Sequence, residues 1–233
     1  MMSGSTKGIA LHYYKYSESS IISKIFTKES GLKSYIIKGI RNKKSKTKLN
    51  LLMPLSLIEI ESTNNIKSSL QYIKEIKSVF PLQGIYNDMS KKFICMFVSD
   101  VLLRVLVENK KDSTLYKFIE NIILDLSVSK NIPKNYILIF LLKLSECLGF
   151  SPEKSNSEKK YFDLENACFT NSKTHYFIEG QNKSYLADIL NNKDVEIPYK
   201  NRKDLILKIQ EFFFIHQYNI QNLKSYNTIE SLR

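Results

Sequence analysis

Short segments of alternating apolar and polar side chains fill the first 80 residues, and this pattern constrains the fold more than any other feature of the chain. In the first segment Ile9, Leu11 and Tyr13 share one face. Alternation with a period of two residues predicts strands, and β-branched and aromatic side chains favour them. Five strands are therefore expected, over residues 7–14, 19–27, 33–40, 51–61 and 70–79.

Two of these segments depart from plain alternation. Along 51–61 the apolar side chains change face between Leu57 and Ile58, which indicates a bulge or a bend. The last segment places Leu70 and Ile73 three residues apart, a spacing that suits a helix as well as a strand. Both interpretations of 70–79 remain open.

Helical periodicity replaces alternation after Pro81, and a polar stretch over 151–160 predicts an exposed loop. Short strands are expected within 161–178. Helices are predicted over residues 88–107, 115–126, 133–148, 182–190 and 201–218.

An all-β region of this size hides its strand edges best by closing into a barrel. The fold class predicted is therefore α+β. A five-stranded OB-fold barrel over residues 1–80 is followed by a mainly helical domain over residues 81–233.

The positive charge is concentrated near the N-terminus. The formal net charge is +12, of which residues 1–80 carry +9 and residues 81–233 carry +3. An AT-rich coding bias would raise the lysine content evenly along the chain, so it does not explain this asymmetry. A basic N-terminal region favours a polyanionic partner.

Residues 33–48 hold seven basic side chains and no acidic one. A short charge run is often only a solvated loop. OB-folds, however, bind oligonucleotides around strands two and three, where this segment would lie. Tyr35, Tyr13 or Tyr14 would either stack bases or pack in the core. The candidate nucleic-acid-binding residues are Lys33, Tyr35, Lys38, Arg41, Lys43, Lys44, Lys46 and Lys48.

Catalytic motifs are missing from the sequence. It contains no P-loop, no dinucleotide fingerprint, no HExxH and no GxSxG. Glu59 and Glu61 share a strand face without a third carboxylate at a telling spacing. We therefore predict no catalytic residue, no cofactor and no metal site. The cysteines and histidines are scattered, at Cys95, Cys147, Cys168, His12, His175 and His216.

The chain shows no membrane or export signal. Its longest uninterrupted apolar run covers residues 136–142, far short of the roughly 20 residues that span a bilayer. Residues 1–8 lack the apolar core of a signal peptide. We expect a soluble protein of the cytoplasm, associated with the nucleoid.

Residues 7–46 resemble the opening of the RecO family of bacterial recombination-repair mediators. The details look most like the Bacteroidetes branch, and weaker matches extend the resemblance over nearly the whole chain. The most specific matches are Tyr16-Ser17-Glu18-Ser19-Ser20, Ile25-Phe26-Thr27, Gly31-Leu32 and Lys38-Gly39-Ile40-Arg41. Weaker ones include Pro54-Leu55, Leu148-Gly149-Phe150 and Tyr161-Phe162-Asp163-Leu164.

The resemblance implies an N-terminal OB-fold, a helical C-terminal domain and a mediator that is not an enzyme. RecO proteins bind single- and double-stranded DNA, anneal complementary strands and bind RecR. With RecR they help load the RecA recombinase onto DNA coated by single-strand binding protein. Some members contact the acidic C-terminal tail of that protein directly. The family's basic OB-fold positions carry over to Lys33, Lys38 and Arg41.

An acidic tail would need an apolar pocket with a cationic rim, for which Lys91, Lys92 and Arg104 are candidates. For Lys91 and Lys92 we favour a solvated first turn of a helix.

Many RecO proteins also carry a four-cysteine zinc site after the Gly-Phe that matches Gly149-Phe150. This region holds only Cys168, so we predict an irregular, zinc-free insertion near residues 151–180. Two alternative functions remain open: a generic OB-fold RNA-binding module, and a nuclease or transferase that uses a divalent metal.

Overall fold

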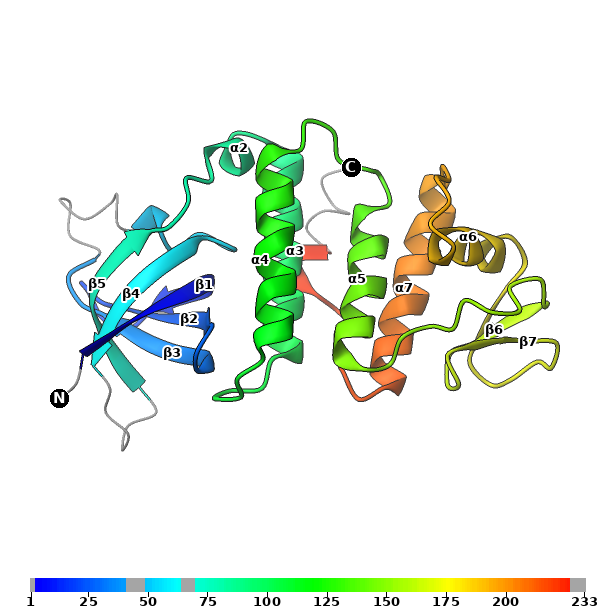
Figure 1. The fold of residues 1–233 in the computed structure, drawn as a ribbon, viewed down its shortest axis with the longest axis horizontal. Coiled ribbons are helices and arrows are strands. Elements are labelled where there is room, and N and C mark those ends of the chain that lie inside the picture. The colour runs from blue at the N-terminus through cyan, green and yellow to red at the C-terminus, as the bar shows by residue number, and fades with distance from the viewer. Residues whose placement is uncertain (1–2, 41–48, 64–69, 227–233) are drawn as a thin grey trace. The chain divides into compact units, whose positions relative to one another are not determined.

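A computed structural model describes residues 3–40, 49–63 and 70–226 (Figure 1). The chain divides into two compact units, one formed by Met1–Lys130 with Leu223–Arg233 and the other by Asn131–Asn222. The division at residue 130 differs from the predicted domain boundary at residue 80. The helices that follow the barrel up to residue 130 belong to the same compact unit as the barrel.

The first unit contains a closed five-stranded barrel. Neighbouring strands follow the order β1-β2-β3-β5-β4, and β4 also pairs with β1. Only β3 and β5 run parallel to each other. This is the predicted OB-fold topology. The strands are β1 (Ser3–Lys15), β2 (Ile21–Thr27), β3 (Gly31–Ile37), β4 (Leu57–Thr63) and β5 (Leu70–Ser78).

The ambiguous fifth segment is a strand. Leu70–Ser78 pairs with both β3 and β4, and the hydrogen bonds of two neighbours hold it extended. The prediction of one strand over 51–61 is wrong for the first half of that segment. Residues 51–56 form turns, and β4 begins at Leu57. Leu55 adopts a left-handed backbone conformation with φ of 65°, which ends any extended run.

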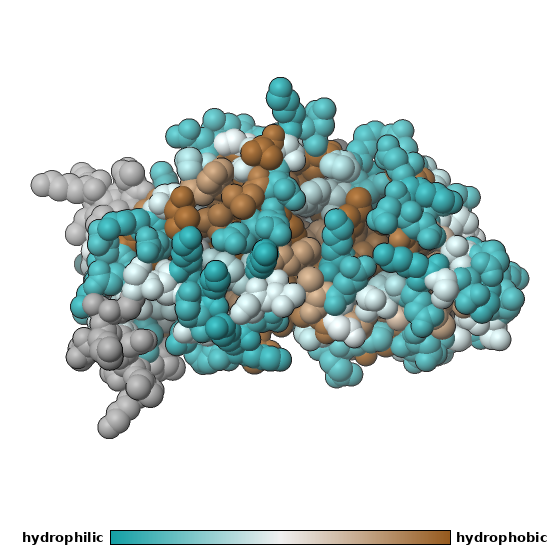
Figure 2. Space-filling view, viewed as in Figure 1, coloured by the Kyte–Doolittle hydropathy of each residue, from teal (hydrophilic) through white to brown (hydrophobic). Residues whose placement is uncertain are grey.

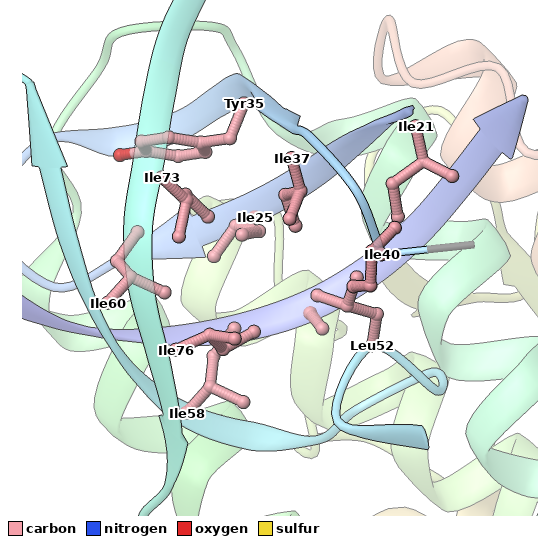
Figure 3. Packing of buried hydrophobic residues seen from close by; sticks show 11 residues of the cluster. Ile21, Ile25, Tyr35, Ile37, Ile40, Leu52, Ile58, Ile60, Ile73 and Ile76 are labelled. Atoms are coloured by element: carbon pink, nitrogen blue, oxygen red, sulfur yellow. The ribbon is translucent and has the colours of Figure 1, made fainter. Parts of the chain in front are cut away.

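The barrel is filled mainly by isoleucine (Figure 3). β-branched side chains suit a pleated strand, and each one buried removes apolar surface from water, worth about 1.5–3 kcal/mol. Ile40 and Leu52, from the segments between β3 and β4, join the same cluster. The members of the cluster are Ala10, Ile21, Ile25, Tyr35, Ile37, Ile40, Leu52, Ile58, Ile60, Ile73 and Ile76.

Between the barrel and residue 130, the structure describes the helices α2 (Gln83–Tyr86), α3 (Met89–Val105) and α4 (Ser113–Val128). Aspartate caps both long helices, since Asp88 accepts hydrogen bonds from the first-turn amides of α3, and Asp112 accepts one from the amide of Leu115 at 2.8 Å. The helices predicted at 88–107 and 115–126 are thus confirmed.

Part of the outer wall of the barrel is covered within this unit. The ring of Phe26 on β2 lies 5.5 Å from the ring of Tyr116 on α4. The amide of Asn109 donates a hydrogen bond of 2.9 Å to the carbonyl of Leu32 on β3. One end of the β2–β3 surface therefore faces helices rather than solvent.

The second unit combines α5 (Tyr136–Leu148), α6 (Gly180–Leu190) and α7 (Tyr199–Ile215) with a small sheet. The sheet has the order β7-β6-β8, formed by Cys168–Thr170, Tyr161–Asp163 and Phe177–Glu179. The short strands expected within 161–178 are confirmed.

Aromatic packing supports this part of the second unit. Phe150 stacks on His216 with ring centroids 4.9 Å apart, and its ring lies 5.3 Å from that of Phe212. Phe162 and Phe169 connect β6 to β7 with their ring centroids 5.0 Å apart. Within the described parts of the chain, no three His, Cys, Asp or Glu side chains gather in a way that would hold a metal ion.

The surface in view is mainly hydrophilic, with apolar side chains gathered near α2 and the C-terminal end of α4 (Figure 2). Val128 at the end of α4 is the most exposed of the large apolar residues described. None of the described helices is both long enough and apolar enough to span a bilayer.

Candidate nucleic-acid interface

The predicted binding residues fall into two groups. Arg41, Lys43, Lys44, Lys46 and Lys48 lie outside the described residues. Lys33, Tyr35 and Lys38 belong to β3 or follow it directly, and the structure does not bring them together. Lys33 is half-buried near the start of β3, whereas Lys38 is exposed just beyond its end. Five steps of extended chain separate them by about 16 Å.

Tyr35 lies inside the barrel, where Figure 3 shows its ring among the isoleucines. Only 3% of its surface is exposed, so neither face of the ring is available to a nucleobase. Burial raises the pKa of Tyr35 to about 12, although the hydrogen bond with Thr27 opposes this effect. The prediction that Tyr35 binds nucleic acid is therefore wrong, and its role is in the core.

The same alternation explains where Lys33 lies. Residues 33, 35 and 37 share one face of β3, and Tyr35 and Ile37 belong to the core cluster. Lys33 therefore lies on the inward face, opposite Ile25 of β2, and its polar end must reach solvent at the mouth of the barrel. Lys38 lies on the outward face instead.

A row of outward-facing residues crosses four strands of the barrel. Tyr14 of β1 pairs with Ile22 of β2, Ile22 pairs with Ile36 of β3, and Ile36 pairs with Tyr72 of β5. Directly paired residues place their side chains on the same face of a sheet. The two tyrosines are exposed, whereas the two isoleucines between them are buried.

Lys38 lies against one end of this row. Its Nζ is 4.8 Å from the centroid of the Tyr72 ring, within the range of a cation–π contact. Lys74 is exposed two residues beyond Tyr72 on β5, at the irregularity where the pairing of β5 with β4 leaves it out of the ladder. This corner of the barrel therefore combines an aromatic ring with two cations.

The same end of the barrel also holds the turn between β1 and β2. Lys15 pairs with Ile21, which in turn pairs with Ile37 near the end of β3. Lys15 and Tyr16 are exposed there. The basic residues within 41–48 follow Ile40 directly in the sequence, outside the described residues.

Acidic residues limit the candidate interface on the β4 side. Glu59 and Glu61 alternate along the outward face of β4, and Glu59 accepts a hydrogen bond from Ser5 at 2.6 Å. Glu75 of β5 forms a 3.3 Å ion pair with Lys77. A phosphate backbone would be repelled from this mixed surface, which leaves β1, β2, β3 and the start of β5, where Tyr72 pairs with β3.

Sequence reasoning missed Tyr72 and Lys74. They join the surface through the parallel pairing of β3 with β5, which connects segments more than 30 residues apart. The only sequence signal for these two residues was the alternation along 70–79, which puts Tyr72 and Lys74 on the polar face. That signal holds only if 70–79 is assigned as a strand rather than a helix.

Two of the three cysteines, Cys95 and Cys168, have thiols whose pKa is raised. Burial raises the pKa of the Cys95 thiol to about 12, although the charge of Lys91 opposes this effect. Burial also raises the pKa of Cys168, and the carboxylate of Asp163 adds to that shift. Both thiols therefore stay protonated at neutral pH.

This chain is similar to several proteins named DNA repair protein RecO. A sequence model of the family described as "Recombination protein O N terminal" matches residues 1–82. The chain is 30% identical to the DNA repair protein RecO of Flavobacterium johnsoniae, over 97% of this chain and 98% of that protein. It is 31% identical to the RecO protein of Bacteroides fragilis over the same shares.

A third relative, the DNA repair protein RecO of Phocaeicola vulgatus, is 36% identical over 70% of this chain and 68% of its own length. The two longer alignments include the barrel and the helices that follow it, so the similarity is not confined to the OB-fold. On this similarity and the OB-fold topology together, the chain belongs to the RecO family.

Proposed function

We propose that this protein is a DNA repair and recombination mediator that binds single- and double-stranded DNA through the basic side of its OB-fold barrel. One observation carries the proposal: the chain is similar over 97% of its length to proteins named DNA repair protein RecO. The exposed cations Lys38 and Lys74 and the basic residues within 41–48 support it, because all of them belong to the strongly positive first 80 residues of the sequence.

The binding is mainly electrostatic. Lysine and arginine side chains that contact phosphates release counterions, and this release favours association at low salt. Contacts with about five phosphates of a single strand would give a slope of roughly −3.5 for log K against log salt. The described surface carries no constellation that reads base edges, so we expect binding with little sequence preference.

Strand annealing follows from the same charge. Two complementary strands repel each other through their phosphates, and a protein that neutralises part of this charge lowers the barrier to pairing. We infer that the protein acts with RecR to load RecA onto DNA coated by single-strand binding protein, whose acidic tail it contacts. This role needs no catalytic group, no ATP and no metal, and it is carried out on the nucleoid.

The test measures annealing and partner binding together. Purified protein is mixed with complementary oligonucleotides in the presence of a chelator and without ATP, and is separately passed over a sizing column with RecR of the same organism. We expect faster annealing than in buffer and co-elution with RecR. If neither is observed, the mediator proposal is wrong.

The two alternatives predict different results in the same assays. A generic RNA-binding module would bind an RNA strand more tightly than the matching DNA strand and would not co-elute with RecR. A nuclease would degrade the labelled strand when Mg²⁺ or Mn²⁺ replaces the chelator.

A further inference from the structure

The row formed by Tyr14, Ile22, Ile36 and Tyr72 has the composition of a stacking surface. Tyr14 is 45% exposed and Tyr72 is 42% exposed, whereas Ile22 and Ile36 are 6% and 4% exposed. Strands lie about 4.8 Å apart, so the three intervals of the row separate the tyrosine backbones by about 14 Å measured along the curved sheet. The row therefore runs around the closed barrel from one exposed aromatic ring to the other, across two isoleucines that are themselves covered.

The tyrosines lie outside the part of the barrel that is packed against the rest of the unit. At one end of β2 and β3, Phe26 contacts Tyr116 and Leu32 accepts a hydrogen bond from Asn109. On the neighbouring strands β1 and β5, Tyr14 and Tyr72 remain exposed instead of joining that packing. A ligand that covers an exposed aromatic ring removes its apolar surface from water, and this removal favours binding.

The charges beside the row suit a nucleotide. Lys38 holds its ammonium 4.8 Å from the Tyr72 ring and leaves the opposite face of that ring uncovered by this contact. A base that stacks on Tyr72 would bring its phosphate within reach of the flexible side chain of Lys38. His12 lies beside Tyr14, with ring centroids 6.5 Å apart, and extends the aromatic surface at the other end.

We propose that Tyr14 and Tyr72 bind unpaired nucleobases by stacking, and that this row makes the protein prefer single strands to duplex. The inference rests on the proposed function and adds a base-binding element to a surface otherwise argued from charge. In a duplex the faces of the bases are already stacked on each other, so only an unpaired strand offers them to the tyrosines.

The first experiment separates stacking from phosphate binding. Wild type, Tyr14→Ala, Tyr72→Ala and the double variant are titrated with a thymidine oligonucleotide, with an abasic strand of the same length, and with duplex. Each alanine variant should bind the thymidine strand about 10-fold more weakly, which corresponds to about 1.4 kcal/mol for one stacked base. Binding to the abasic strand and to duplex should change less than about 2-fold.

Two controls accompany these variants. Tyr14→Phe and Tyr72→Phe keep the aromatic face and should retain the wild-type affinity. Tyr199→Ala removes a tyrosine of matched exposure, 45%, from the start of α7 in the other compact unit, and it should have no effect on the preference for the thymidine strand.

A second measurement does not depend on the alanine variants folding well. The chain contains no tryptophan, so Tyr72→Trp and Tyr14→Trp each introduce a single indole, whose emission can be excited separately from that of the tyrosines. A base that stacks on the indole should quench its emission, whereas the abasic strand should not. Tyr199→Trp serves as the matched control.

The outcomes separate the two proposals. Loss that is specific to the thymidine strand, with quenching at positions 14 and 72, supports stacking. The stacking proposal is wrong if the alanine variants bind the thymidine strand as tightly as wild type does. It is also wrong if their affinity for the abasic strand falls by the same factor. In both cases the proposal that the protein binds DNA by charge is unaffected. If wild type binds no DNA at all, the proposed function fails, and this inference fails with it.

Discussion

The hydroxyl of Ser99 on α3 donates a hydrogen bond of 2.5 Å to the main-chain carbonyl of Leu11 on β1. Leu11 lies at the irregularity of β1, where the pairing with β2 shifts between Ala10 and His12. A bulge leaves one residue out of the regular ladder, so its polar groups need partners elsewhere. Ser99, which is buried, provides one such donor and connects the first long helix to the barrel.

Replacing Ser99 by alanine should lower the free energy of unfolding by about 1–3 kcal/mol, because the Leu11 carbonyl loses a donor in a buried place. Urea titration followed by circular dichroism measures the change. Ser90→Ala on the same helix removes an exposed hydroxyl and should change the free energy by less than about 0.5 kcal/mol. Equal effects of the two substitutions would contradict this role of Ser99.

Gly31 lies where β3 meets the segment between α3 and α4. Its φ is +72°, and an added Cβ would lie 2.0 Å from the carbonyl oxygen of Lys110. Gly31→Ala should therefore destabilise the protein by more than about 4 kcal/mol, since backbone must move to relieve the clash. Thermal or urea unfolding measures this cost.

Gly149 is the matched control for Gly31. Its φ is +90°, but no atom lies within 4 Å of an added Cβ. Gly149→Ala should cost only the roughly 1–2 kcal/mol of a left-handed backbone in a residue with a side chain. If both substitutions cost the same, the contact with Lys110 does not contribute.

The strands could be predicted because alternation is a local property of the sequence. The packing of helices against the barrel could not be predicted in this way, although the sequence of β2 indicated that something covers its outer face. Ile21 and Ile25 face the barrel interior, while Ile22 and Phe26 on the opposite face are also buried. A strand that is apolar on both faces indicates that both faces are covered. Which helix covers the second face is decided by non-local packing.

Of the candidate interface, the sequence indicated one exposed cation but not the residues of the neighbouring strand. Charge concentration indicated the end of β3, and Lys38 lies exposed there. Lys33, Tyr35 and Ile37 alternate along β3 and therefore share one face of the strand. Once Tyr35 is assigned to the core, Lys33 must also face inward. Tyr72 enters the surface only through strand pairing, which periodicity does not reveal.

Lys91 stabilises the end of α4 rather than lying in a solvated turn. Only 5% of its surface is exposed, and its Nζ donates a hydrogen bond of 2.6 Å to the carbonyl of Ser129, the C-terminal cap of that helix. The expectation of a solvated Lys91 is therefore wrong. A cation at a helix C-terminus satisfies an unpaired carbonyl and interacts favourably with the helix dipole.

Lys91→Met keeps the apolar stem and removes the charge, so it should cost about 1.5–3 kcal/mol of unfolding free energy. Lys92→Met is the neighbouring control and should cost less than about 0.5 kcal/mol. Urea titration compares them, and a larger loss for Lys92→Met would overturn the assignment.

Alkaline pH should destabilise the first compact unit. Burial raises the pKa of Tyr35, Tyr86 and Cys95 to about 12, above their ordinary values of 9 to 10. The folded state then holds more protons than the unfolded state in this window. Stability is full below about pH 9 and decreases as pH rises toward about 12. Urea midpoints measured across this range should fall steadily.

Tyr35→Phe tests the contribution of one group to this alkaline loss. The variant has no phenol to ionise, so its urea midpoint should fall less steeply with pH than that of wild type, whatever its stability at neutral pH. Parallel slopes for the two proteins would show that the hydroxyl of Tyr35 does not account for the loss.

The basic end of β3 should set the salt dependence of DNA binding. A variant in which Lys38, Arg41, Lys43 and Lys44 are all replaced by alanine removes four cations, and each phosphate contact contributes about −0.7 to the slope on single strands. The slope of log K against log salt should therefore flatten by up to about 2.8. Binding to single strands and to duplex should weaken together, because phosphate contacts carry no base information.

The matched control removes the same net charge from the second compact unit, by replacing Lys154, Lys159, Lys193 and Lys200 with alanine. Both variants lower the formal charge from +12 to +8, so a slope that depends on total charge alone would flatten equally in both. A slope that flattens only in the first variant assigns the phosphate contacts to the barrel. An unchanged slope in the first variant would show that the DNA follows another path. The phosphate contacts expected beside Tyr14 and Tyr72 would then be absent.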